Sequence, residues 1–139
     1  MGLFTKKAKV ILDTNFLLQL GKGVDIFTEI ERVIVEPYEL YYIDQTLIEL
    51  KNIMDGKAKG RTKGADKFNA KLAFILIQQK GLKTLKSSSE YVDDAIVAIA
   101  EKGVYVATMD ANLQRRVDKK GAKVLITRQN SHVVIKEKV

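Results

Sequence analysis

The sequence predicts a three-layer α/β/α fold with a central, mostly parallel five-stranded sheet. Segments typical of strands and of helices alternate along the chain, and this alternation favours a parallel sheet with helices on both faces. Two of the expected strands, residues 10–12 and 104–107, are continuous apolar runs, as in strands that are buried on both faces. A length of 139 residues and a hydrophobic content of 46% fit one domain, residues 1–139, with one core.

The first half of the chain alternates in the expected way. The strand at residues 10–12 ends at Asp13, where apolar residues at helical spacing begin. Residues 25–35 should form a second helix, which ends before Pro37 because the residue before a proline disfavours helical backbone. Residues 38–43 are aromatic and β-branched, which predicts a strand.

The middle of the chain contains the segment that we expect to be most mobile. Asp44 is suited to cap a third helix. A Gly/Lys-rich loop at residues 56–64 separates that helix from a long fourth one, and a short strand at residues 82–85 follows. Ser87 and Glu90 have the spacing of a capping box, so we expect the next helix to begin there.

The last part of the chain adds two more helix and strand pairs. Glycines close the expected helices because a left-handed residue commonly ends a helix. We expect a helix up to about Lys102, a strand at 104–107, a helix from Asp110 and a strand at 124–127, with 133–135 as a candidate additional edge strand.

Charge is unevenly distributed along the chain. Lys and Arg outnumber Asp and Glu by 24 to 17, giving a net charge of +7. Residues 13–55 carry nine acids and three bases, residues 57–86 nine bases and one acid, and residues 113–139 eight bases and two acids. Basic charge gathered in this way favours a polyanionic partner. The alternative is that the lysine-rich helix faces are simply solvated.

Several function classes are disfavoured by what the sequence lacks. Without cysteine there is no disulfide, no thiolate metal site and no thiol nucleophile. No apolar run reaches the roughly 20 residues of a membrane span, and the first seven residues lack the apolar stretch of a signal peptide. We therefore expect a cytoplasmic protein with no membrane partner. His132 is the only histidine, which excludes a two-histidine mechanism. Its position in the C-terminal tail is more typical of a surface residue than of a catalytic one.

Acidic residues fall where the predicted sheet would bind a ligand. In open parallel sheets, ligands bind beyond the carboxyl ends of the strands. Asp13 directly follows the first strand, and Asp110 follows a later one. Asp93 and Asp94 stand in the first turn of an expected helix, and Glu49 lies on the helix after the second strand. The fold can therefore bring these acids to one edge of the sheet.

Clustered carboxylates imply a bound cation. Their mutual repulsion raises their pKa values unless a cation neutralises them. Mg²⁺ or Mn²⁺ would do so, and would also polarise a phosphodiester and activate a water molecule. Each acid also has an ordinary structural interpretation, as a helix cap, a partner of the helix dipole or a surface residue. Their expected convergence favours the metal site.

Four segments resemble the motifs of PIN-domain nucleases, and they occur in the same order. They are ILDTNFLL from Ile11, LIEL from Leu47, VDDAIVA from Val92 and VATMDANL from Val106. The resemblance covers nearly the whole chain, and it implies a single PIN domain with a Rossmann-like α/β fold.

The resemblance implies a role for individual residues. It implies that four acids bind Mg²⁺ or Mn²⁺ and cut single-stranded RNA: Asp13, Glu49, Asp94 and Asp110, with Asp93 as the alternative to Asp94. Asn15 would orient a carboxylate or a bound water, and Thr108 would support the site through its hydroxyl.

Six basic residues are the candidates for RNA contact. They are Lys57, Lys59, Arg61 and Lys63 in the Gly/Lys-rich loop, and Arg115 and Arg116 after the last acid. Because PIN relatives often dimerise, a homodimer is a further implied assembly.

Three details resemble the processome-type PIN proteins, which are linked to processing of precursor ribosomal RNA for the small subunit. These are the pair of aspartates, the Arg115-Arg116 pair and Thr127-Arg128-Gln129. The chain looks like an archaeal version, without the cysteines of eukaryotic relatives. A metal-dependent endoribonuclease acting on precursor ribosomal RNA is therefore implied. One alternative is a toxin ribonuclease, which usually has a less basic segment after the last acid. The other is an RNA-binding or assembly module with little catalysis, which the presence of all four acids disfavours.

Overall fold

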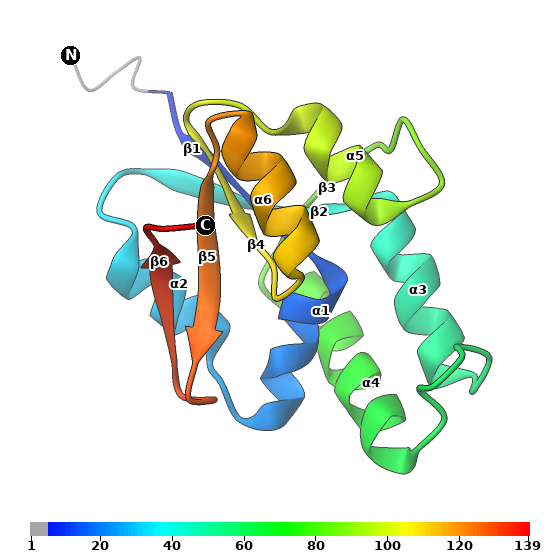
Figure 1. Cartoon of the computed structure of the whole chain (residues 1–139). Coiled ribbons are helices and arrows are strands. Elements are labelled where there is room, and N and C mark those ends of the chain that lie inside the picture. The colour runs from blue at the N-terminus through cyan, green and yellow to red at the C-terminus, as the bar shows by residue number, and fades with distance from the viewer. Residues whose placement is uncertain (1–5) are drawn as a thin grey trace.

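A six-stranded sheet with the order β3-β2-β1-β4-β5-β6 forms the centre of the protein in the computed structural model, which describes residues 6–139 (Figure 1). The first five strands are parallel, and β6 pairs antiparallel with β5. The candidate edge strand is thus confirmed as a sixth strand. The strands are β1 (Ala8–Leu12), β2 (Tyr38–Ile43), β3 (Lys83–Leu85), β4 (Val104–Ala107), β5 (Lys123–Arg128) and β6 (His132–Lys136). The prediction that the chain begins without a signal peptide rests largely on residues 1–5, which lie outside the described residues.

Helices connect the strands and cover both faces of the sheet, as predicted. They are α1 (Thr14–Leu17), the 3₁₀ helix η2 (Leu18–Lys22), α2 (Ile26–Val33), α3 (Asp44–Met54), α4 (Gly64–Gln79), α5 (Val92–Ile99) and α6 (Ala111–Lys119). Helices α3 and α4 lie side by side (Figure 1). Within the described part of the chain, no helix combines the length and apolar character that crossing a membrane requires.

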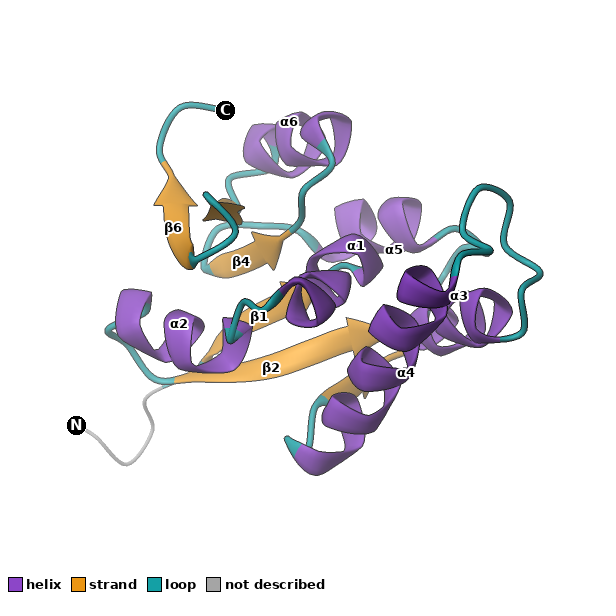
Figure 2. Cartoon of the chain, turned by 90° about the horizontal axis from the view of Figure 1, so that it is seen from below, coloured by secondary structure: helices purple, strands orange, loops and turns teal. Residues whose placement is uncertain are grey.

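The strands supply apolar side chains to two separate cores because successive side chains point to opposite faces of a sheet. Val10 and Leu12 of β1 pack with residues of the first five helices, whereas Ile11 between them packs with residues of α5 and α6. The result is the predicted three-layer arrangement, which can be followed in Figure 2.

Two local predictions about helix caps were wrong. Helix α5 begins at Val92 after Tyr91, rather than at a capping box formed by Ser87, and it ends at Ile99. The Ser87 amide instead donates to the Asp44 carboxylate at 3.0 Å. Asp44 is the first residue of α3 rather than its cap, and this carboxylate fixes the loop that leads to α5.

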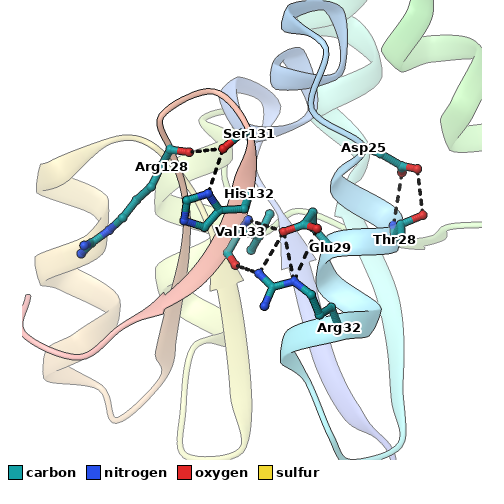
Figure 3. Close-up of polar contacts among 8 residues, drawn as sticks. All are labelled: Asp25, Thr28, Glu29, Arg32, Arg128, Ser131, His132 and Val133. Carbon is teal, nitrogen blue, oxygen red and sulfur yellow. Dashed lines mark hydrogen bonds and ion pairs between the residues drawn. The ribbon is translucent and has the colours of Figure 1, made fainter.

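The free edge of β6 is covered by two side chains of α2 (Figure 3). The Glu29 carboxylate accepts from the Val133 amide at 3.0 Å, and the Arg32 guanidinium donates to the Val133 carbonyl at 2.8 Å. Arg32 also donates to Glu29 at 2.9 Å. These bonds satisfy backbone groups that an edge strand otherwise offers to another chain. His132 is half-buried beside them, with its Nδ1 2.9 Å from the Ser131 hydroxyl.

Candidate active site

The site begins where two central strands end side by side. Strands β1 and β4 pair in parallel, with Leu12 opposite Ala107. The Asp13 amide continues this ladder by donating to the Ala107 carbonyl at 2.9 Å. Asp13 and Thr108, the next residues after the two strands, are therefore neighbours at the carboxyl edge of the sheet, the edge at which the sequence predicted Asp13 to lie.

Asp13 is an almost fully buried carboxylate, only 7% exposed. One oxygen accepts from the Thr14 amide at 2.9 Å, and the other accepts from the Thr108 hydroxyl at 2.7 Å. Burial raises the pKa of this carboxyl to about 6, and the negative charges of Glu49 and Asp110 add to the effect. The two hydrogen bonds lower the pKa but do not compensate for burial.

Asn15 and Asp110 complete the turn that faces Asp13. The Asn15 side-chain oxygen accepts from the Met109 amide at 3.0 Å, which fixes the backbone after β4. The Thr108 hydroxyl accepts from the Asp110 amide at 3.1 Å. The Asp110 carboxylate caps α6 by accepting from two amides of its first turn. The capping interpretation of this acid is therefore correct, and it is compatible with a place in the site.

Glu49 reaches the site from α3 through a pair of threonines. Its carboxylate accepts from the Thr14 hydroxyl. The Thr14 and Thr46 hydroxyls share a hydrogen bond of 3.0 Å, and Thr46 is fully buried one turn before Glu49. Glu49 is itself exposed, so these contacts hold an accessible carboxylate beside Asp13.

The two consecutive aspartates at the start of α5 have different positions. Asp93 lines the same cavity as Asp13, whereas Asp94 is absent from its lining. Asp94 is instead paired with Arg116 of α6 at 2.8 Å, and Arg116 also lies 3.7 Å from Asp93. The geometry therefore favours Asp93, the alternative, over the preferred Asp94.

A cavity of about 460 Å³ joins these groups. Five carboxylates line it, those of Asp13, Glu49, Glu90, Asp93 and Asp110. Of the six basic residues predicted to contact RNA, Lys59 and Arg61 also line it. Lys57, Lys63 and Arg115 are exposed but outside its lining, and Arg116 is held by the two aspartates. Acidic and basic groups thus share one cavity, although only part of the predicted basic set does so.

Comparison with known proteins identifies the family. A family model described as "PIN like domain" matches residues 10–130.

The chain belongs to the PIN-like domain family.

The resemblance predicted from the four motifs is thereby confirmed. This PIN-like domain is 28% identical over 130 residues to "Ribonuclease VapC4" of Methanocaldococcus jannaschii, a match that covers 91% of this chain and 95% of that protein. The fold of this chain is also similar to the solved structure titled "Structure of the PIN domain endonuclease Utp24". The TM-score is 0.73 and the sequence identity is 23%, over 94% of this chain and 92% of that chain.

The carboxylates of this PIN-like domain suit a divalent cation chemically. A buried acid with a raised pKa, near two other negative charges, is a site that a cation would stabilise, and Mg²⁺ and Mn²⁺ prefer oxygen ligands. Within residues 6–139, no three such side chains lie close enough together to form a complete metal-binding group. The oxygen ligands that line the cavity therefore fit a divalent cation chemically. Their carboxylates are spread around the cavity and do not converge on a single position.

Sequence reasoning missed three residues that support the site: Thr14, Thr46 and Gln114. The Gln114 amide donates to the Thr108 carbonyl at 3.0 Å, and its oxygen accepts from Lys136 at 2.8 Å. Helical spacing could have suggested two of them, since residues three or four apart share a helix face. Gln114 is four residues after Asp110, and Thr46 is three before Glu49.

Proposed function

We propose that this PIN-like domain is a metal-dependent endoribonuclease that cuts phosphodiester bonds in RNA. The observation that carries the proposal is the buried Asp13, which shares one cavity with four further carboxylates and with the basic Lys59 and Arg61. Acids that hold a metal beside bases that hold a phosphate backbone are the combination that a nuclease needs. The names of the two relatives, a ribonuclease and an endonuclease, support the same activity.

Each group has a separate task in this proposal. Asp13, Glu49, Asp93 and Asp110 would hold Mg²⁺ or Mn²⁺, with Asp93 in place of Asp94. When bound, the ion supplies charge that stabilises the phosphate in the transition state, and it activates water.

The remaining residues orient these acids and hold the substrate. The Thr108 hydroxyl keeps Asp13 in place through its hydrogen bond, and Asn15 fixes the turn that carries Asp110. Lys59 and Arg61 would contact phosphates next to the bond that is cut.

We propose precursor ribosomal RNA as the substrate, because the aspartate pair and the Arg115-Arg116 pair resemble those of processome-type PIN proteins. The alternative is a toxin ribonuclease, which the 28% identity to "Ribonuclease VapC4" supports. A further alternative is an RNA-binding or assembly module with little catalysis. A cytoplasmic location and a homodimer remain part of the proposal.

The decisive experiment is a cleavage assay on precursor ribosomal RNA with Mg²⁺, Mn²⁺ or a chelator, run beside Asp13→Asn. We expect cleavage that needs the metal and that the variant lacks while it remains folded. Full activity of the variant would contradict the assignment of Asp13. RNA binding without cleavage by the wild type would favour the assembly module. Growth arrest on expression, relieved by a neighbouring gene product, would favour the toxin.

A further inference from the structure

Tyr91 stands apart from the other tyrosines of the protein. Tyr38, Tyr41 and Tyr42 lie on β2 and Tyr105 on β4, where all four are buried or half-buried. Tyr91 is 62% exposed and precedes α5. It nevertheless lines the cavity that holds the carboxylates. An aromatic ring at the wall of this cavity is therefore accessible to a ligand.

The cavity lining around Tyr91 combines apolar and acidic residues, since Val92 follows Tyr91 and the acids Glu90 and Asp93 stand on either side. Leu18, Ile53 and Val92 also line the cavity, although each is at most 5% exposed. A cavity of about 460 Å³ lies within the usual range for small-molecule sites, so it has room for a base beside a phosphate. The acids and bases account for a phosphate and its metal, but they do not account for the exposed aromatic ring of Tyr91.

We propose that Tyr91 is a positioning residue on which a base of an unpaired nucleotide stacks, next to the phosphate that the carboxylates face. This inference rests on the proposed function, and it adds the side chain that would hold the unstacked base. A base inside a duplex has both faces covered by its neighbours, so a side chain reaches it only where the strand is single and splayed. Lys59 and Arg61, on the Gly/Lys-rich loop that lines the same cavity, would hold the phosphates that flank this base.

The test measures binding separately from cleavage. Fluorescently labelled single-stranded RNA is titrated against proteins that all carry Asp13→Asn, so that the RNA stays intact. Tyr91→Leu removes the ring and Tyr91→Phe keeps it. Phe68→Leu is the matched control, because Phe68 is 61% exposed on α4 and lies outside the cavity lining. Since Tyr91 is largely exposed, its replacement leaves the core unchanged.

We expect Tyr91→Leu to weaken the affinity roughly 5- to 150-fold, the range measured for stacking of one base on an aromatic ring. Tyr91→Phe and Phe68→Leu should bind as the parent does. An abasic nucleotide at one position should weaken binding to the parent equally and should have no further effect on Tyr91→Leu, because both changes remove the same contact.

Three results would overturn the inference. One is an unchanged affinity of Tyr91→Leu for single-stranded RNA, which would mean that the exposed ring of Tyr91 contacts a protein partner instead of RNA. Another is an equal loss in Tyr91→Phe, which would assign the effect to the hydroxyl. The last is an equal loss for a fully paired duplex. If single-stranded RNA binds through Tyr91 but the wild type never cleaves it, the proposed activity fails while the stacking contact stands.

Discussion

Asp13 combines the role of a helix cap with a place in the candidate metal site, which the sequence presents as alternatives. Its carboxylate caps α1, as an aspartate after a strand often does. Capping a helix does not by itself require a buried carboxylate, because only one of its two oxygens needs to accept a hydrogen bond from the helix. Here the second oxygen is bonded to Thr108 inside the protein, and burial raises the pKa to about 6. The ionised side chain is thus held in an unfavourable environment, as expected of a group that awaits a cation.

The first prediction concerns the stability of the metal-free protein. Because the folded-state pKa of Asp13 is raised from 3.8 to about 6, its contribution to stability is fully present below pH 3.8 and is lost as the pH rises through about 6. Relative to Asp13→Asn, which does not titrate, the wild type should lose about 3 kcal/mol of unfolding free energy across this window. Urea denaturation in a chelator at several pH values measures the difference.

The same pair of proteins tests cation binding. Mn²⁺ added at neutral pH should raise the melting temperature of the wild type, because a ligand that binds only the folded state stabilises it. Asp13→Asn should respond much less. A pH-independent stability difference, together with equal responses to Mn²⁺, would contradict the role given to this carboxylate.

The second prediction concerns Thr108, which is fully buried. Thr108→Val keeps the shape of the side chain but removes the hydrogen bond that lowers the pKa of Asp13. The pKa should therefore rise further, and the acidic limb of the pH–rate profile should move to higher pH. Loss of such a supporting contact typically lowers activity about 10- to 100-fold. Thr108→Ser, which retains a hydroxyl, should behave as the wild type does; a profile unchanged by valine would contradict this role.

The sequence predicted that Asp13, Asp110 and Glu49 converge at one edge of the sheet, and all three line the cavity there, but it did not resolve Asp93 from Asp94. Consecutive residues of a helix point about 100° apart, so the choice depends on where the helix begins. The Ser87 and Glu90 pattern predicted an earlier start than Val92. The direction of each aspartate follows from the packing of α5 on α6, where Arg116 binds Asp94, and that packing involves residues far apart in the sequence.

At the scale of elements, strands and helices were predictable because each has its own apolar periodicity. The predictions of helix caps were wrong where a polar side chain forms its hydrogen bond with a different element of the fold. Asp44 has the residue type of a helix cap, yet its carboxylate also binds the Ser87 amide before α5. Local patterns cannot distinguish a side chain that caps its own helix from one that binds a loop about 40 residues away.

The third prediction concerns the joint between α2 and β6. The pKa of Glu29 is lowered, first by its hydrogen bond with Arg32 and then by the Val133 amide. This contact therefore stabilises the protein above the ordinary glutamate pKa, and its contribution is lost as the pH falls through the lowered value. At neutral pH, Glu29→Ala should speed hydrogen exchange of the Val133 amide and promote association through the uncovered edge of β6.

Glu31→Ala is the control for this joint, because Glu31 is exposed on the same helix. Exchange and size-exclusion chromatography should show the wild-type behaviour for this variant. An unchanged exchange rate in Glu29→Ala would mean that β6 is held by its pairing with β5 alone.

At the scale of the whole molecule, the chain order of the charges becomes a spatial arrangement. The parallel sheet brings the acids that follow β1 and β4, together with acids of α3 and α5, to one edge, and the loop between α3 and α4 brings two bases to the same cavity. The sequence predicted the edge because parallel strands share a direction. It could not predict which loop residues face the cavity, since a Gly/Lys-rich loop has no periodicity.

The last prediction uses this difference within a single loop. Lys59 and Arg61 line the cavity, whereas Lys57 and Lys63 are exposed outside its lining. For single strands, each phosphate contact contributes roughly 0.7 to the slope of log affinity against log salt. Replacing Lys59 and Arg61 by alanine should therefore lower this slope by about 1.4. Replacing Lys57 and Lys63, which removes the same charge, should lower it less. Equal changes for both pairs would mean that RNA responds only to the overall positive charge, and that the loop does not contact the strand in the cavity.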